Sequence, residues 1–182
     1  MREGTAPLIH RLEYQQPAFW IRKVDLTLDL DPTKTLITSK LQVERNRAVP
    51  HAPLRLHGEE LNLLRVLIDG ASVSFRQEGA ELVIEGAPDA DFLLEIRNTT
   101  CPEKNTALSG LYTSGGSFFT QCEAEGFRRI TYFLDRPDVM AVYTVTLRAD
   151  ATKYPVLLSN GNLVDSGSLD NGRHFAVWAD PF

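Results

Sequence analysis

The chain has 182 residues, of which 43% are hydrophobic and 24% charged, and its formal net charge is −5 at pH 7. This composition is ordinary for a one-domain globular protein and excludes a disordered or low-complexity chain. The negative charge and the lack of any basic block argue against a nucleic-acid partner, because phosphate binding depends on clustered lysine and arginine.

The N-terminal residues contain no apolar run of the kind that a secretory signal needs, and no segment approaches the ~20 apolar residues that cross a membrane. We therefore expect a cytoplasmic location and no membrane partner. Cys101 and Cys122 are the only cysteines, and we expect both to be reduced thiols. Cys122 has no His or Lys beside it in sequence to lower its pKa, which favours a small packed side chain over a reactive one.

Strands with a period of two begin at residue 24. Apolar and polar residues alternate over 24–30, a turn is predicted at 31–34, and alternation resumes over 35–43, so a long hairpin is expected. The pair Asp69-Gly70 is a second strong turn signal. Further short strands are predicted at 61–68, from Val73 to Phe75, at 82–84 and at 92–96.

Residues 98–138 interrupt this regularity with several glycines and a proline, and long irregular connections in compact domains are often functional. Beyond them, Asn160-Gly161 and Asn171-Gly172 each lie between extended runs, which predicts that the C-terminal third is a meander of hairpins. The expected fold is all-β, an antiparallel β-sandwich or saddle-like sheet with hairpins and an irregular insertion, in one domain over 1–182.

The four histidines are scattered and form no pair at the i, i+4 spacing that places two imidazoles on one helical face. They are His10, His51, His57 and His174. His51 and His57 lie among prolines and a glycine, which favours surface loops over metal ligands for both. We expect no metal site and no catalytic residue in this chain.

The segment from Gln121 to Glu125 concentrates hydrogen-bonding side chains directly after an aromatic pair. Two carboxylates beside an amide form an anionic patch, which complements a cation that carries N–H donors, such as the free amino end of a peptide. A solvated surface with no ligand is the alternative that composition leaves open.

The runs Gln121–Arg128 and Ile130–Val139 resemble the N-terminal domain of the zinc aminopeptidases of the bacterial aminopeptidase N type. The resemblance covers nearly the whole chain, because four further segments match in order. These are Asp25–Asp31, Ala52–Leu56 with Gly58-Glu59, Asn105–Leu108 with Gly110-Leu111-Tyr112, and Leu158–Asn162.

The resemblance implies a hydrolase in which zinc is held by a His-Glu-x-x-His helix and a downstream Glu, with a Gly-x-Met-Glu-Asn strand along the substrate. Neither motif occurs in this sequence. The chain is therefore expected to be the first domain of a larger enzyme, without the catalytic zinc domain and without a final strand that follows Phe182. The implied cofactor is zinc, bound outside this chain, and the implied partners are the enzyme's own catalytic domain and a peptide N-terminus.

Carried over from the family, Glu123 holds the substrate's free α-ammonium and Gln121 lies beside it, so the substrate-binding residues are Glu123 and Gln121. Glu125 would share a face with Glu123 on an extended segment but receives no ligand role. Asp135 is expected either to cap a turn or to pair with a neighbouring Arg, and to belong to a scaffold that shapes the segment from Gln121 to Glu123.

Two other classes of function remain open from the residues alone. A stand-alone β-sandwich could bind a ligand such as carbohydrate through exposed Trp20, Trp178 or Phe118. An autonomous hydrolase could use Glu123 and Glu125 as an acid and base pair.

Overall fold

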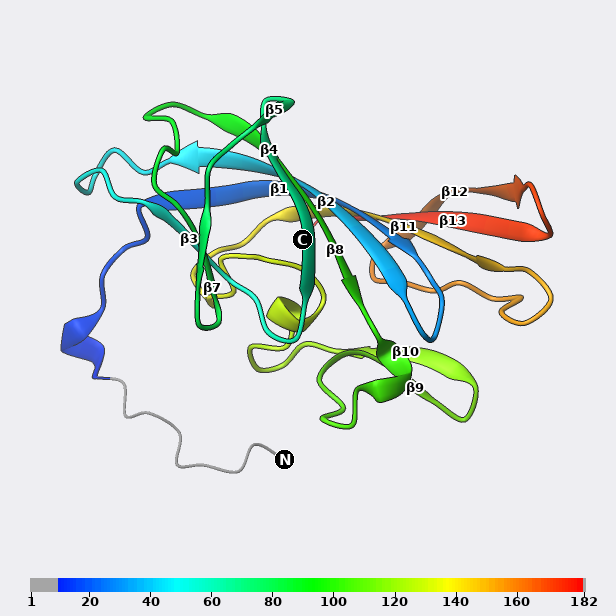
Figure 1. Cartoon of the computed structure of the whole chain (residues 1–182). Helices are drawn as coiled ribbons and strands as arrows, with labels where there is room; N and C mark the ends of the chain where they lie inside the picture. Colours follow the sequence, from blue (N-terminus) through cyan, green and yellow to red (C-terminus); the bar gives the residue numbers. More distant parts are fainter. Residues whose placement is uncertain (1–9, 182) are drawn as a thin grey trace.

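The computed structural model describes residues 10–181, which form strands joined by turns (Figure 1). The strands are β1 (Phe19–Asp29), β2 (Thr35–Arg45), β3 (Leu54–His57), β4 (Asn62–Ile68), β5 (Ala71–Ser72), β6 (Arg76–Glu78), β7 (Glu81–Ile84), β8 (Phe92–Thr100), β9 (Gly110–Ser114), β10 (Ser117–Gln121), β11 (Val142–Asp150), β12 (Asn162–Leu169) and β13 (Arg173–Asp180). Single 3-10 turns are η1 (Arg11–Glu13), η2 (Pro102–Lys104) and η3 (Phe127–Arg129). No helix in the described range is long and apolar enough to cross a membrane.

Three sheets make up the fold. The large sheet has eight strands in the order β12-β13-β11-β1-β2-β8-β4-β5, the second has the order β3-β7-β6, and β9 and β10 form a separate hairpin. In Figure 1 the small sheet lies beside one end of the large sheet and the β9–β10 hairpin lies below its middle. The prediction of an all-β fold with hairpins is confirmed.

The long first hairpin is confirmed, and a bulge sets the register of β1. Buried side chains occur at Phe19 and Ile21 and then at Val24, so the spacing of two changes to three once. The pairing of β1 with β2 shifts between Ile21 and Lys23 at the same place. One extra residue on β1 therefore keeps the apolar side chains on the inner face along the whole strand.

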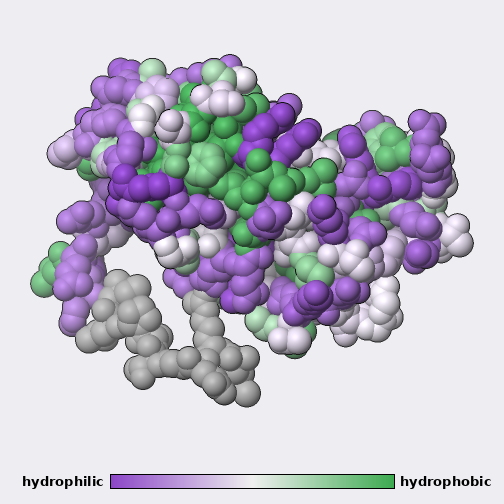
Figure 2. All heavy atoms as spheres, in the orientation of Figure 1, coloured by the Kyte–Doolittle hydropathy of each residue, from purple (hydrophilic) through white to green (hydrophobic). Residues whose placement is uncertain are grey.

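The core lies between the inner face of the large sheet, the small sheet and the segment 130–134. Its fully buried side chains come from β1, β2 and β8 on one side and from β3 and β7 on the other. In the face shown in Figure 2, apolar atoms gather in the middle and hydrophilic atoms cover most of the periphery.

A buried chain of hydrogen bonds joins the large sheet to the segment 130–134. Asn98 on β8 donates to the Ile130 carbonyl oxygen at 2.9 Å and accepts from the Thr131 hydroxyl at 3.0 Å. The Thr131 hydroxyl also lies 3.1 Å from the hydroxyl of Ser39 on β2. These three side chains are fully buried, so the hydrogen bonds fix where the segment lies against the sheet.

The predicted meander at the C-terminus is wrong in its pairing. β11 pairs with β1 in parallel and with β13 in antiparallel orientation, so β13 lies between β11 and β12. The turn at Asn171-Gly172 joins β12 to β13 as expected. Residues 155–159 form no strand, however, and Asn160-Gly161 leads into β12 without closing a hairpin.

A second, smaller difference concerns the turn at Asp69-Gly70. Both residues have positive φ and join β4 to β5 as expected. The following strand ends at Ser72, so the stretch from Val73 to Phe75 lies between β5 and β6. Within residues 10–181 the edges of the large sheet are β12 and β5. That a further strand completes the domain stays a prediction.

We expect Asn98→Leu to lower the free energy of unfolding by about 2 kcal/mol, because the Ile130 carbonyl oxygen would be left buried without its donor. Asn62, an exposed residue that donates to the Thr99 hydroxyl, offers a matched control. Asn62→Leu should cost less than about 0.5 kcal/mol. Urea denaturation of both variants tests this, and equal costs would show that the buried hydrogen bonds contribute little.

Candidate functional site

The β9–β10 hairpin carries Gln121 at its end. The hairpin reverses at Gly115 and Gly116, whose φ values of 56° and 83° few other residues adopt easily. On the hairpin, Phe119 pairs with Tyr112, and their rings stack with centroids 5.8 Å apart. This pairing gives the strand a fixed register up to Gln121, from which the chain enters the turn 122–126.

The turn 122–126 closes tightly on the end of β10. Gly126 donates its N–H to the Cys122 carbonyl oxygen at 2.7 Å. A Cβ on Gly126 would lie 2.5 Å from the Gln121 carbonyl oxygen and 2.8 Å from the Cys122 Cα. Both are backbone atoms that cannot move aside, so the turn depends on glycine for space at this position.

The Gln121 side chain belongs to the turn that carries Glu123. Its amide Nε2 donates to the Glu123 backbone carbonyl oxygen at 3.0 Å. Both side chains are exposed, and the Glu123 carboxylate forms no ion pair with a cation of residues 10–181. The structure thus brings the two predicted binding residues together, with the carboxylate of Glu123 and the amide oxygen of Gln121 both open to solvent.

Glu125 has different surroundings from Glu123. An extended segment would place both carboxylates on one face, but residues 123–126 form a turn and Glu125 has a φ of 60°. Its carboxylate lies 3.5 Å from a guanidinium nitrogen of Arg128. Glu125 therefore has a cationic partner in the chain itself, which argues against a Glu123–Glu125 acid and base pair.

Arg128 and Asp135 form a shielded ion pair behind the turn. One Asp135 carboxylate oxygen accepts from the Arg128 backbone N–H at 3.1 Å and from its Nε at 2.9 Å. The Arg128 Nη2 also donates to the Asp135 carbonyl oxygen at 2.9 Å. Of the two roles considered for Asp135, the pairing with a neighbouring Arg is the one observed, and the partner comes from the turn η3.

His57 supports Asp135 from the end of β3. Its Nδ1 accepts from the Asp135 backbone N–H at 3.3 Å. Burial, with Arg128 beside it, lowers the pKa of His57, so the ring is neutral at pH 7 and can accept this hydrogen bond. The expected surface-loop position holds for exposed His51 and is wrong for His57, which is half-buried on a strand.

Arg129 ties η3 to the segment after β3. Its guanidinium group contacts Glu59 at 3.1 Å and Glu60 at 2.8 Å, and Glu59 also donates its N–H to the Arg128 carbonyl oxygen at 2.9 Å. No motif in the sequence connects residues 59 and 60 with residue 129.

Among residues 10–181, five carboxylates and two guanidinium groups lie around the turn, which gives these described groups a formal net charge of −3. The carboxylates are those of Glu59, Glu60, Glu123, Glu125 and Asp135, and the guanidinium groups are those of Arg128 and Arg129. Four of the carboxylates have an arginine partner, and Glu123 has none among the described residues. The surplus of negative charge favours a cationic ligand at Glu123.

Both cysteines are free thiols in the structure. Cys122 is half-buried and packs against the core. Burial raises the pKa of its thiol to about 11, and the nearby carboxylates of Asp135 and Glu123 add to this shift. A thiol with such a pKa is almost entirely protonated near neutral pH, which agrees with the expected packing role.

Two of the remaining histidines bond to backbone carbonyl oxygens. His51 lies 3.2 Å from the Ala87 oxygen and His174 lies 2.7 Å from the Tyr154 oxygen, in each case through Nε2. Residues 10–181 contain no group of three or more His, Cys, Asp or Glu side chains that could hold a metal ion. The described side chains therefore do not fit a zinc site.

The three aromatic side chains considered for carbohydrate stacking are all packed to some degree. Trp178 is half-buried and donates its Nε1 to the Leu157 carbonyl oxygen at 3.2 Å, and Phe118 lies against Tyr154 with ring centroids 4.9 Å apart. Trp20 is half-buried and has the Arg22 guanidinium over its ring.

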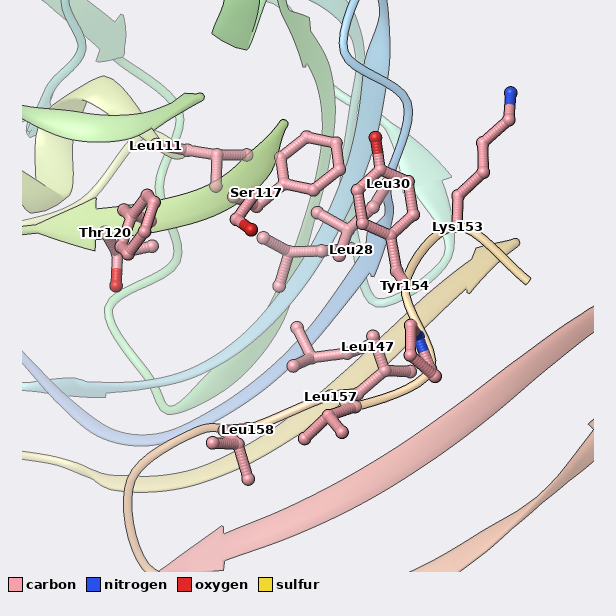
Figure 3. A pocket seen from close by; sticks show the side chains of 14 residues that line it. Leu28, Leu30, Leu111, Ser117, Thr120, Leu147, Lys153, Tyr154, Leu157 and Leu158 are labelled. Atoms are coloured by element: carbon pink, nitrogen blue, oxygen red, sulfur yellow. The ribbon is translucent and has the colours of Figure 1, made fainter. Parts of the chain in front are cut away.

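An apolar groove of about 300 Å³ lies between the β9–β10 hairpin and residues 153–158 (Figure 3). Leucines of four segments face it, among them Leu28, Leu111, Leu147 and Leu157. Neither Gln121 nor Glu123 lines this groove. The hollow is thus separate from the anionic turn, whose chemistry comes from exposed side chains.

Gly126→Ala should lower the free energy of unfolding by about 2 kcal/mol or more, because the new methyl group would overlap backbone atoms of Gln121 and Cys122. Gly86→Ala is the matched control, since a Cβ there would meet nothing within 4 Å. It should change the stability by less than about 0.5 kcal/mol. Thermal or urea unfolding checks both, and a neutral Gly126→Ala would disprove the close packing of the turn.

The comparisons with known proteins agree on one family. Residues 13–182 match the model of the Peptidase M1 N-terminal domain. The chain is 51% identical over 174 residues to aminopeptidase N of Escherichia coli, a match that covers 95% of this chain and 20% of that protein. It is 49% identical to aminopeptidase N of Caulobacter vibrioides, over 100% of this chain and 21% of that protein.

Solved structures agree with the sequence matches. Aminopeptidase A of Legionella pneumophila, crystallised in complex with aspartic acid, superposes with a TM-score of 0.86 at 32% identity, over 93% of this chain and 20% of that one. An M1 zinc metallopeptidase from Deinococcus radiodurans shares the fold, with a TM-score of 0.75 at 18% identity, over 90% of this chain and 39% of that one. The chain spans about a fifth of the length of the curated relatives it matches. It belongs to the Peptidase M1 N-terminal domain family.

Proposed function

We propose that this chain is the N-terminal domain of a zinc aminopeptidase and that its turn 122–126 binds the free α-ammonium group of a peptide substrate. The single observation that carries the proposal is the Glu123 carboxylate, which has no cationic partner among the described residues while each acid around it has one. The family relationship and the aminopeptidase relatives support the reaction class.

The geometry at Gln121 supports a second contact to the same ammonium. The Gln121 Nε2 is already used in the hydrogen bond to the Glu123 carbonyl oxygen, so its Oε1 is the side of the amide left for a ligand. That oxygen is an acceptor, as is the Glu123 carboxylate. An ammonium group carries three N–H donors, and these two side chains accept two of them.

This pair of acceptors, Glu123 and Gln121, favours the free amino end of a peptide over its internal peptide nitrogens. An internal peptide nitrogen is neutral and has one N–H, so it can neither neutralise Glu123 nor serve both acceptors. A terminal ammonium gains a charge-assisted hydrogen bond of about 1.5–3 kcal/mol. Fixing the first residue in this way also fixes which peptide bond reaches the reacting groups.

The hydrolysis itself is assigned to groups outside this chain. Zinc, when bound in the complete enzyme, would polarise the scissile carbonyl group and lower the pKa of a bound water. The described residues of this chain offer no ligand set for it. Their proposed part is to bind and orient the substrate's amino end and to form one wall of the cleft beside the enzyme's catalytic domain.

We also propose that the protein acts in the cytoplasm. Cys101 and Cys122 are both free thiols, which suits a reducing compartment.

In the full-length protein, Glu123→Gln should lower kcat/KM for peptides with a free amino end by about 10-fold or more, since the neutral amide keeps the shape and removes the charge. Glu125→Gln is the matched control, because it removes a carboxylate two residues away that is paired with Arg128. Its effect should be clearly smaller. Steady-state kinetics on dipeptide substrates would contradict the proposal if both variants lost activity equally.

The isolated 182-residue chain should hydrolyse no aminoacyl substrate, and added zinc should not change this, because its described side chains form no metal-binding group. The full-length protein, assayed in parallel, should be active. Stoichiometric zinc in the isolated chain, together with turnover that a chelator abolishes, would overturn this division of roles.

A further inference from the structure

The position of Glu123 depends on how the two ends of its turn are held. At one end the turn continues from β10, whose register is fixed by pairing with β9. At the other end it enters η3, a single 3-10 turn with no long helix behind it. A segment this short cannot hold its own position, so contacts made by η3 side chains must supply the anchor.

Arg128 makes the strongest of these contacts. Asp135 accepts hydrogen bonds from both the backbone N–H and the side chain of Arg128, and the Asp135 carbonyl oxygen accepts a third. The side chains of Arg128 and Asp135 are only 11% and 16% exposed, so solvent screens this pair weakly. Three hydrogen bonds between two residues fix both the place and the direction of the guanidinium group.

Asp135 is itself fixed to the body of the domain. Its N–H bonds to His57, and the neighbouring Phe133 exchanges two backbone hydrogen bonds with His57, at 2.8 and 3.1 Å. Upstream, Thr131 belongs to the buried hydrogen bonds that start at Asn98. The position of Arg128, and with it the end of the turn, is therefore set by the two sheets.

The same pair controls which carboxylates Arg128 can neutralise. Held by Asp135, the guanidinium group lies 3.5 Å from Glu125 and 4.0 Å from Glu59, and it makes no ion pair with Glu123. Glu123 lies five residues before Arg128, at the other side of a tight turn. A released Arg128 guanidinium group would compete with a substrate's ammonium group for that carboxylate.

We propose that Arg128 and Asp135 form a positioning pair for Glu123. The pair holds the turn 122–126 in place and keeps the Arg128 guanidinium away from the Glu123 carboxylate, which stays available to the substrate's amino group. This inference rests on the proposed ammonium-binding role of Glu123. Neither Arg128 nor Asp135 contacts the substrate in it.

The test is a double-mutant cycle of Asp135→Asn and Glu123→Gln in the full-length protein, with KM and kcat measured for a dipeptide with a free amino end. Asn keeps the shape of Asp135 and an acceptor for the Arg128 N–H but removes the charge that holds the guanidinium. Asp135→Asn alone should raise KM by about 5-fold or more and change kcat by less than about 2-fold. In the Glu123→Gln background, Asp135→Asn should change KM by less than about 2-fold, because the Glu123 carboxylate that the pair positions is no longer present.

The KM and kcat values separate positioning from loss of folding. A variant that only unfolds part of the protein lowers the apparent kcat through the active fraction and leaves KM unchanged. Asp138→Asn is the matched control, since it breaks another Arg–Asp pair of the same segment, with Arg136, that does not contact the turn. It should leave KM within about 2-fold of the parent.

Each outcome decides between the two proposals. Loss of substrate affinity in Glu123→Gln with no change in Asp135→Asn, or with additive effects of the two, overturns the positioning pair and leaves the ammonium site standing. No effect of Glu123→Gln overturns the ammonium site and this inference with it. If Asp135→Asn does not fold, Arg128→Lys in the same cycle decides, because it keeps the charge and loses the fixed geometry; additivity there also overturns the pair.

Discussion

The attachment of residues 130–135 to the inner face of the large sheet is the constraint on which the site depends. Asn98, Thr131 and Ser39 hold the start of this segment in a place from which water is excluded, and His57 holds its end. Because a buried polar group without a partner costs about 1–3 kcal/mol, these hydrogen bonds specify one position rather than merely adding stability. These hydrogen bonds therefore also fix the position of Asp135. Through its contacts with Arg128, Asp135 in turn fixes the turn 122–126.

The described residues around the turn carry more carboxylates than guanidinium groups, and this difference determines the electrostatics of the site. Arg128 and Arg129 are the arginines that pair with acids around the turn. Their guanidinium groups are held by Asp135, Glu59 and Glu60. Among the described residues, Glu123 is the carboxylate around the turn that has no cationic partner, and it is the one that the family resemblance singles out. An exposed carboxylate without such a partner, among further negative charges, is suited to bind a cation.

Period-two alternation predicted the first hairpin, and the Asp69-Gly70 and Asn171-Gly172 turns followed from the conformational freedom of glycine. The same reasoning failed at Asn160-Gly161. There, residues 155–159 are held to β13 by side chains, through His174 to the Tyr154 oxygen and Trp178 to the Leu157 oxygen, and not by a backbone ladder.

Gly161 has a positive φ, as a hairpin turn would require, but it also passes close to β13. A Cβ there would lie 2.1 Å from the Ala179 carbonyl oxygen. Local sequence does not distinguish a glycine needed for a turn from one needed for a close approach. The sequence also did not predict the parallel pairing of β1 with β11, or the contacts of Glu59 and Glu60 with Arg129. These interactions join residues far apart in the chain.

The exposure of Glu123 sets what this chain can achieve by itself. An exposed ion pair contributes about 0–1 kcal/mol, because water screens the charges and both groups lose mobility. A charge-assisted hydrogen bond of about 1.5–3 kcal/mol, as proposed for the substrate's amino end, requires a site from which water is largely excluded. The turn provides the carboxylate and its orientation. A second protein surface must exclude water and so lower the local dielectric constant. The curated relatives, of which this chain spans about a fifth, have the length to provide it. We therefore expect that recognition of the amino end arises only where this domain meets the rest of the enzyme.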